Sequence, residues 1–341
     1  MMTIKVGIIG CGSIAVHRHI PEYQENDTAE IVAFCDINKQ RSDELAQTYG
    51  GTSYSDYNEL LADDTVEAVS ICTPNYLHAE MTIAALNAGK HVLCEKPMAT
   101  SLDDADKMIA AAEKSGAKLM ISHNQRLNEA HQAAKQDVAA GKLGKIYSFK
   151  TTFGHPGPEG WSVDGPDSWF FDKKRAFIGA MGDLGVHKAD LMRYILGEEF
   201  KEVGAMIETS AKAKATVDDN AVLILKSTGG IIGTLSASWA YNGEEDNSTV
   251  LYGEKGVLKL NADPDYSYIF IGADGEVDKQ QLGEMQTNDE DGQVNSHTID
   301  AFIQSIIEDT VPICDGEEGR ASLNIILKAI EAAETNTITR F

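Results

Sequence analysis

A glycine-rich turn near the N-terminus constrains the fold of this chain more than any other feature. A short apolar run over Ile4–Gly10 leads directly into the motif G-x-G-x-x-A at residues 10–15, and a helical pattern follows over Ala15–Tyr23. In this context the first glycine permits a tight turn, and the second lets the backbone approach a pyrophosphate whose charge is met by the helix N-terminus. The motif therefore predicts a dinucleotide site. The residues expected to line it here are Gly10, Gly12, Ser13 and Ile14.

An acidic residue at the end of the next predicted strand indicates which dinucleotide is bound. That strand is expected over Ile31–Asp36, so Asp36 stands 24 residues after Gly12. A carboxylate at this place accepts hydrogen bonds from the adenosine ribose hydroxyls and repels a 2′-phosphate. We therefore predict NAD as the cofactor, with NADP less favoured, although Lys39 and Arg41 lie close by and soften the preference.

The first third of the chain alternates short apolar strands with helices, which is typical of βαβ units and of a parallel sheet covered on both faces. Its strands are expected at Ile4–Gly10, Ile31–Asp36, Val66–Thr73, His91–Cys94 and Lys118–Ser122. Its helices are expected at Ala15–Tyr23, Lys39–Tyr49, Tyr76–Ala88 and Leu102–Lys114. This pattern predicts an α/β Rossmann domain, with a doubly wound parallel sheet, over residues 1–124.

After about Gln125 the pattern changes to a helix and then to longer alternating strands with hairpin-like turns, the clearest at Gly229-Gly230. The expected strands are Ile146–Phe153, Val203–Glu208, Ala221–Ser227, Ile231–Trp239, Thr249–Gly253 and Val257–Leu260. Later helices are expected at Gly182–Leu196, Ser296–Ile307 and Glu318–Glu334. Residues 125–341 are therefore predicted to form an α+β domain with a large, mainly antiparallel sheet.

Composition excludes several classes of protein. The chain carries 53 acidic and 29 basic residues, a formal charge of −24, which repels nucleic acid and anionic lipid. No apolar run approaches the roughly 20 residues that span a bilayer, and the first residues carry no basic segment of a signal peptide. The five cysteines (Cys11, Cys35, Cys72, Cys94 and Cys314) form no C-x-x-C pair and fit free thiols in a reducing compartment. We expect a cytoplasmic protein, with no membrane or nucleic-acid partner and no metal site.

Three further motifs follow predicted strands or open a predicted helix. Thr73-Pro74-Asn75 ends one strand, Cys94-Glu95-Lys96-Pro97 follows the next, and G-x-x-x-D-x-G-x-H at residues 179–187 opens a helix in the second domain. The E-K-P tripeptide is weak alone, but its pairing with the third motif behind a G-x-G-x-x-A is specific. From Lys5 to about Glu334 the chain resembles the Gfo/Idh/MocA oxidoreductases, which include glucose–fructose oxidoreductase and inositol dehydrogenase.

This resemblance implies a Rossmann domain and an open-faced sheet domain that supplies substrate contacts and often the oligomer interface, so we expect a homodimer or homotetramer. It also implies a sugar, inositol or related polyol as substrate. By similarity, the catalytic positions are Lys96, Asp183 and His187. The positions expected to contact the cofactor ribose and nicotinamide are Thr73, Pro74, Asn75, His78, Glu95 and Lys96.

The residue types suit hydride transfer at an alcohol or ketone. Asp183 and His187 stand at i and i+4 of the predicted helix, so they project from one face. A carboxylate beside an imidazole favours its protonation, which suits His187 to take and return the alcohol proton. The ammonium of Lys96 would stabilise alkoxide character. The alternatives are a structural Asp–His pair on a helix surface and a plain lysine at a strand end.

Other side chains are weaker candidates for substrate contacts. His155, Trp161, Asp167 and Trp169 lie in a Gly/Pro-rich loop over residues 154–169 that is suited to lining a site, and buried anchoring explains the tryptophans nearly as well. Arg126 and Arg175 suit recognition of a carboxylate or, equally, pairing with the many acids. The substrate candidates carried forward are Arg126, His155 and Trp169.

The motifs favour a reversible NAD-dependent sugar or inositol dehydrogenase. One alternative is an enzyme that cleaves glycosides and uses NAD only transiently. Another is a dinucleotide-binding sensor without turnover, against which the intact set Lys96, Asp183 and His187 argues. A reductase of acidic substrates is the third, and it requires Arg126 or Arg175 to face the substrate.

Overall fold

The computed structural model describes residues 3–283 and 295–341, and its internal contacts divide the chain into two units. The first unit comprises the chain up to Asn124, the short segment Trp161–Asp164, and a C-terminal segment that ends at Arg320. The second unit begins at Gln125 and includes Ala321–Phe341. Two segments of the expected second domain are therefore part of the first unit.

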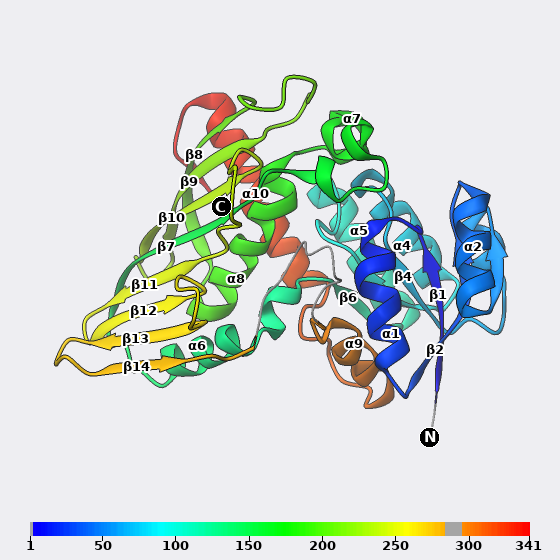
Figure 1. Ribbon diagram of the computed structural model, residues 1–341, viewed down its shortest axis with the longest axis horizontal. Helices are drawn as coiled ribbons and strands as arrows, with labels where there is room; N and C mark the ends of the chain where they lie inside the picture. The colour runs from blue at the N-terminus through cyan, green and yellow to red at the C-terminus, as the bar shows by residue number, and fades with distance from the viewer. Residues whose placement is uncertain (1–2, 284–294) are drawn as a thin grey trace. The chain divides into compact units, whose positions relative to one another are not determined.

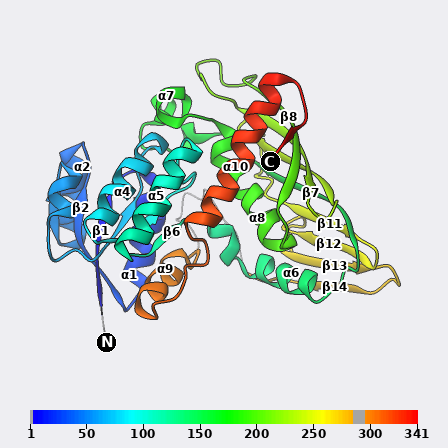
Figure 2. The same cartoon turned by 180° about the vertical axis from the view of Figure 1, so that it is seen from behind.

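Within the described residues, the first unit holds a six-stranded parallel sheet of doubly wound order (Figure 1). In sheet order the strands are β3 (Thr52–Tyr54), β2 (Ala29–Cys35), β1 (Ile4–Ile9), β4 (Ala68–Ile71), β5 (His91–Cys94) and β6 (Leu119–Ile121). Its helices are α1 (Ile20–Glu25), α2 (Lys39–Tyr49), α3 (Tyr57–Leu61), α4 (His78–Asn87), α5 (Leu102–Ser115) and α9 (Thr298–Ile307). Helices α4 and α5 cover one face, whereas α1 and α9 cover the other (Figures 1 and 2). The predicted Rossmann fold is confirmed.

The register of the central strands brings the predicted motifs to one edge of this sheet. Ile9 at the end of β1 pairs with Ile71 of β4, and Ile71 pairs with Cys94 of β5. The glycine turn, Thr73-Pro74-Asn75 and Glu95-Lys96 follow these three ends directly. We call this the carboxyl edge; in open α/β sheets it is where ligands bind.

Within the described residues, the second unit is built on a nine-stranded sheet that is antiparallel except where β10 runs parallel to β7. In sheet order the strands are β14 (Val277–Gln280), β13 (Tyr268–Gly272), β12 (Gly256–Leu260), β11 (Thr249–Gly253), β7 (Ile146–Gly154), β10 (Ile232–Ser238), β9 (Asn220–Ser227), β8 (Phe200–Glu208) and β15 (Thr339–Arg340). The helices are α6 (Glu129–Ala139), α7 (Lys173–Ala176), α8 (Val186–Leu196) and, from Ala321 onward, α10 (Gly316–Thr335). This architecture confirms the predicted mainly antiparallel sheet.

Alternation along the strands of the second unit separates two faces. In β9, Leu223 and Leu225 are buried with residues of α6, α8 and α10 in one core, whereas Val222 and Ile224 are exposed on the other face. Figure 2 shows α8 and α10 together on the covered face. The exposed face is open in this chain.

One predicted helix belongs to the other unit. The helix expected over Ser296–Ile307 was assigned to the second domain, but α9 packs Ile299, Phe302 and Ile303 into the core beneath β1 and α1. The carboxylate of Glu22 accepts the backbone N–H of Ser296 at 2.9 Å and so fixes the start of this segment. The periodicity of apolar residues correctly predicts that α9 has an apolar face, but it does not indicate which core that face packs into.

Both glycine motifs lead into π-helical turns, η1 (Ala15–His19) and η7 (Met181–Gly185). The segment Gly182–Leu196 is helical as expected, but its first turn is π-helical and α8 begins only at Val186. π-Turns are rare and concentrate at functional positions. Among the described residues, no helix has the length and apolar character needed to span a membrane.

Candidate functional site

The glycine turn has the geometry that a bound pyrophosphate requires. Gly10 has a φ of +93°, and a Cβ there would lie 2.7 Å from the carbonyl oxygen of Cys72. A Cβ at Gly12 would meet no atom within 4 Å, so the backbone at this residue faces open space. A tight turn followed by an accessible backbone at a helix start fits a dinucleotide phosphate.

Asp36 links the glycine turn to the end of β2. Its Oδ2 accepts the backbone N–H of Cys11 at 2.8 Å, and its Oδ1 accepts that of Asn38 at 2.8 Å. The side chain is half-buried at the carboxyl edge. This placement suits a carboxylate that receives ribose hydroxyls.

Each of the two cations near Asp36 is paired with another carboxylate. Nη2 of Arg41 is 2.8 Å from Oδ1 of Asp164, and this hydrogen bond is the main reason that the pKa of Arg41 is raised. Lys39 pairs with Asp43 on the exposed face of α2. Because both cations already have carboxylate partners, the local charge favours NAD over NADP.

Ser13 ties the segment Trp161–Asp164 to the glycine turn within the first unit. Its hydroxyl donates to the carbonyl oxygen of Trp161 at 2.8 Å and accepts the N–H of Val163 at 3.0 Å. The side chain of Ser13 therefore acts on this segment, and its backbone remains the part suited to the phosphate.

His78 bridges two of the motifs. This buried imidazole lies with Nδ1 2.8 Å from the carbonyl oxygen of Pro97 and Nε2 2.8 Å from that of Thr73. Burial lowers the pKa of His78, and the two carbonyls oppose that shift. Both ring nitrogens thus contact backbone carbonyl oxygens at the carboxyl edge. Pro74 and the buried Asn75 begin the short helix η2 (Asn75–Leu77) at the same edge.

Glu95 and Lys96 follow β5 and differ in exposure. Glu95 is buried, whereas Lys96 is half-buried and precedes a cis peptide bond to Pro97. Oε1 of Glu95 is 3.0 Å from Nε2 of His19, and Oε2 accepts the backbone N–H of Lys96 at 3.2 Å. These oxygens contact protein groups, so Glu95 supports the turn that carries Lys96.

In the second unit, Asp183 and His187 are buried on the turn from η7 into α8. Trp239, fully buried, donates its Nε1–H to Oδ2 of Asp183 at 3.2 Å. The ring of His187 lies 6.0 Å, centroid to centroid, from that of Phe153. This environment orients a carboxylate and an imidazole within largely apolar surroundings.

Asp218 holds the start of this helical segment. Its carboxylate accepts the N–H of Gly179 at 2.7 Å and that of Met181 at 2.8 Å, and its carbonyl accepts the N–H of Ala180 at 3.0 Å. A Cβ at Gly179 would lie 1.8 Å from that carbonyl oxygen, so glycine is required there. Burial raises the pKa of Asp218 against these bonds.

The three substrate candidates occupy different environments within the second unit. Arg126 is buried in a bidentate ion pair with Asp190, at 2.7 Å for each contact. Of the two roles expected for Arg126, this contact corresponds to pairing with an acidic residue of the protein. His155 is buried and its Nδ1 accepts the N–H of Gly157 at 2.9 Å. Trp169 is half-buried and stacks on Phe170 with centroids 3.9 Å apart.

Several buried groups near these residues carry no sequence motif. Asp218 lies just before β9 and binds the turn that precedes Asp183, whereas Trp239 lies just after β10 and donates to Asp183 itself; only folding brings these residues together. Lys188, next to His187, is buried and donates to the carbonyl oxygen of Asn247 at 2.9 Å. Burial lowers its pKa to about 7 against the opposing effect of Glu245 and Asp246.

The buried thiols are not suited to act as nucleophiles. All five cysteines are free and buried. Burial raises the pKa of Cys94 to about 12, and that of Cys35 also to about 12. Thiols of this kind remain protonated and unreactive at neutral pH.

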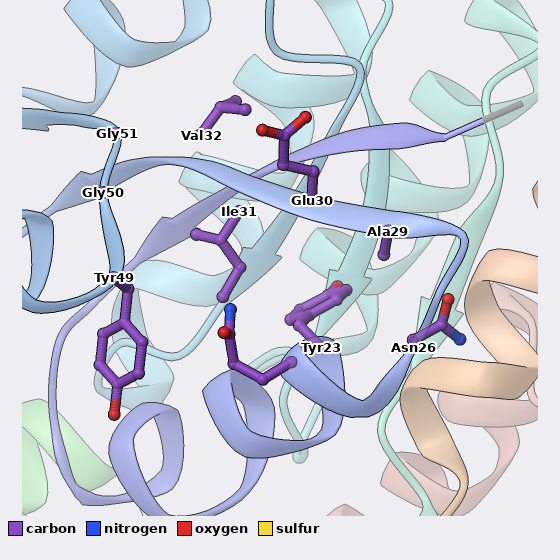
Figure 3. A pocket seen from close by; sticks show the side chains of 10 residues that line it. Tyr23, Asn26, Ala29, Glu30, Ile31, Val32, Tyr49, Gly50 and Gly51 are labelled. Carbon is purple, nitrogen blue, oxygen red and sulfur yellow. The ribbon is translucent and has the colours of Figure 1, made fainter.

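A hollow of about 300 Å³ lies in the first unit away from the carboxyl edge (Figure 3). Tyr23, Asn26, Glu30 and Tyr49 are among its lining residues. None of the residues expected to bind cofactor or substrate lines it, so it is separate from the candidate site.

Comparison with known protein families agrees with this geometry. A family model described as an oxidoreductase family with an NAD-binding Rossmann fold matches residues 4–123. A second, described as the GFO/IDH/MocA C-terminal domain, matches residues 131–259. The chain belongs to the Gfo/Idh/MocA family of oxidoreductases, as its motifs predicted, and it is an NAD-binding enzyme.

Individual relatives share most of their length with this chain. Levoglucosan dehydrogenase of Pseudarthrobacter phenanthrenivorans is 30% identical over 76% of this chain and 74% of its own. The 1,5-anhydro-D-fructose reductase of Ensifer adhaerens is 30% identical over 96% of each. A levoglucosan dehydrogenase solved with NADH and L-sorbose is similar at a TM-score of 0.85, with 25% identity over 100% of this chain and 99% of that one.

Proposed function

We propose that this enzyme transfers a hydride between NAD and a secondary alcohol or ketone of a sugar, inositol or related polyol. The observation that carries the proposal is the carboxyl edge of the first unit, where the open backbone at Gly12 follows β1 and the half-buried Lys96 follows β5, the two strands on either side of β4. The names of the relatives, a levoglucosan dehydrogenase and an anhydrofructose reductase, support a cyclic polyhydroxylated substrate.

Lys96 and His187 divide the acid–base work in this proposal. The bound nicotinamide supplies the acceptor or donor of the hydride. The ammonium of Lys96 stabilises the negative charge that develops on the reacting oxygen. His187 takes the hydroxyl proton during oxidation and returns it during reduction. Asp183, held by the indole N–H of Trp239, orients and supports His187.

Substrate contacts are proposed for His155 and Trp169. The stacked pair Trp169 and Phe170 offers an apolar surface suited to the face of a sugar ring. Arg126 takes no part in this proposal, because its guanidinium is committed to Asp190. Recognition of a substrate carboxylate by Arg126 is therefore disfavoured.

The partners and compartment belong to the same proposal. The open sheet face exposes Met206, Val222, Ile224, Ile232 and Tyr252, and an apolar face of this kind suits a second copy of the chain in a homodimer or homotetramer. The charge of −24 disfavours nucleic acid and anionic membranes. Free buried cysteines suit the reducing cytoplasm.

The test is turnover against a panel of substrates. Purified enzyme is mixed with NAD or NADP and with inositols, aldoses or 1,5-anhydro sugars, and reduced nicotinamide is followed by absorbance. We expect turnover with at least one polyol and NAD, reduced roughly 100-fold or more in Lys96→Ala. Lys114→Ala, which removes a lysine from the exposed end of α5, is the matched control and should keep full activity.

Two results would contradict the proposal. Tight NAD binding without net reduction of any panel member would favour transient redox chemistry or a sensor. Turnover that is unaffected by Lys96→Ala would remove Lys96 from the mechanism.

A further inference from the structure

Four buried side chains form a continuous chain of polar contacts beneath the carboxyl edge. The hydroxyl of Tyr23 lies 2.9 Å from Oγ of Ser70, and Oγ of Ser70 lies 3.1 Å from Nδ1 of His19. Nε2 of His19 lies 3.0 Å from Oε1 of Glu95. All four side chains are at most 5% exposed. The chain joins η1, the helical turn after the glycine motif, to the E-K-P turn.

The Glu95 end determines one proton position. Burial would raise the pKa of Glu95, but the hydrogen bond from His19 and the positive charges of His19, Lys96 and Arg18 lower it to about 2. Glu95 is therefore an ionised acceptor at neutral pH, and Nε2 of His19 must carry a proton to donate to it.

The Tyr23 end of these contacts holds the other side of the imidazole. Burial raises the pKa of Tyr23, so its hydroxyl stays protonated. Oγ of Ser70 lies between this hydroxyl and Nδ1 of His19, at 2.9 and 3.1 Å. The two buried hydroxyls therefore give Nδ1 a partner and fix the ring with Nε2 facing Glu95.

This series of polar contacts positions Glu95 and does not conduct protons. It ends at Tyr23, whose side chain is only 1% exposed, so a proton that entered from Glu95 would have no exit there. At its other end, Glu95 accepts the backbone N–H of Lys96. Any movement of the Glu95 carboxylate is thus passed to the residue that carries the ammonium.

We propose that His19 is a positioning residue, fixed by Ser70 and Tyr23 so that its Nε2–H donates to Glu95, and that it orients Glu95 and through it Lys96. The role of Lys96 in this inference rests on the proposed function. The donation from Nε2 of His19 does not, because it follows from the contact with the ionised Glu95. His19 contacts neither reacting atom and acts only through Glu95.

The first test is a spectroscopic one on the unmodified protein. The enzyme is labelled with ¹⁵N-histidine, and the ring nitrogens of His19 are assigned by comparison with Ser70→Ala. At pH 7, with and without NADH, we expect a proton on Nε2 of His19. A ring whose only proton is on Nδ1 would overturn the proposal. This measurement needs no substrate, so it tests the proposal even if the enzyme turns over no polyol.

The second test distinguishes the hydrogen bond that His19 donates from the volume that its side chain fills. Gln presents an amide N–H where His19 presents Nε2–H, whereas Leu presents none. We expect His19→Gln to retain kcat/KM within about threefold and His19→Leu to lose about 10- to 100-fold at pH 7. Without its donor the buried Glu95 has a raised pKa, so activity of His19→Leu should recover as pH rises and Glu95 ionises. His17→Gln, an exposed change in the same turn, is the control.

The charged and titratable groups that face Glu95 set the background of this pH profile; they are Arg18, His19, Cys72, His78, Cys94 and Lys96. All except His19 are retained in both variants. An extra acid-side ionisation in His19→Leu alone therefore reports Glu95. Equal losses in both variants, or a flat profile in His19→Leu, would contradict a positioning role; if His19→Leu does not fold, the spectroscopic test decides.

Discussion

The carboxylate of Asp36 has two structural partners and one expected ligand. It accepts the N–H groups of Cys11 and Asn38, so its orientation is set before a cofactor arrives. Asp164 forms an ion pair with Arg41, which is the nearest candidate residue for binding a 2′-phosphate. Cofactor preference at this residue is therefore a matter of local charge.

Changing that charge should change the preference. In Asp36→Ser we expect the ratio of kcat/KM for NADP to that for NAD to rise ~10- to 100-fold, about 1.4 to 2.8 kcal/mol, because the repulsion of the phosphate is removed. Adding Asp164→Asn should raise it further by releasing Arg41. Steady-state kinetics with both dinucleotides measure this, and Asp43→Asn, which releases the exposed Lys39, is the control. An unchanged ratio would mean that Asp36 does not face the ribose.

Single side chains differ in how well the sequence predicts them. Gly10, Gly12 and Asp36 were predictable because their spacing from one strand is local. For Arg126 the sequence left recognition and pairing open, and only folding brings Asp190 to its guanidinium. The expected cofactor contacts of His78 and Glu95 were inferred from motif position, whereas their contacts are with backbone and with His19.

At the scale of elements, the start of the helix that bears Asp183 depends on a residue 35 positions further along the chain. Asp218 binds the N–H groups of Gly179 and Met181, and a π-turn follows at once. Its neighbour Asp219 binds the N–H groups of Ser210, Ala211 and Lys212 in a separate loop. Adjacent carboxylates thus hold two different segments.

These neighbours give a matched pair of variants. Asp218→Asn places an amide N–H against backbone donors and should cost about 1 to 3 kcal/mol of unfolding free energy. It should also lower kcat, because Asp183 loses its position. Asp219→Asn should destabilise comparably and leave kcat near wild type. Urea unfolding and steady-state kinetics measure both; equal kcat in the two variants would show that the helix start is not tied to catalysis.

Element prediction succeeded for several segments with clear local patterns. Helix α2 and strand β5 have the expected bounds, and β11 does as well. Strands β3, β13, β14 and β15 and helix α3 were not predicted; each has five residues or fewer. Such segments are stabilised mainly by neighbours in the sheet, which a local pattern does not contain.

For the whole molecule, the open sheet face of the second unit is the feature with the clearest consequence. Val222 and Ile224 of β9 stand beside Met206 of β8 and Ile232 of β10 on this face. Apolar side chains on neighbouring strands form a continuous surface, which is the kind that a second copy covers.

A charge on this surface should separate the copies. We expect Ile224→Glu to shift the protein toward the monomer in size-exclusion chromatography with light scattering, because it buries an unpaired carboxylate in the interface. Val311→Glu adds the same charge at an exposed loop of the first unit and should leave the mass unchanged. A wild-type protein that is already monomeric at micromolar concentration would refute the proposed interface.

The sequence alone determined the Rossmann fold, the dinucleotide class and the family. Each depends on spacings within one strand–turn–helix unit or on short motifs at strand ends, and such patterns survive whatever the rest of the chain does. Only the tertiary structure decided that α9 packs under β1 and α1, that Asp218 binds the turn before Asp183, that Trp239 donates to Asp183, and that His19 contacts Glu95. These contacts join residues tens to hundreds of positions apart, and they form because buried polar and apolar groups must find partners in three dimensions.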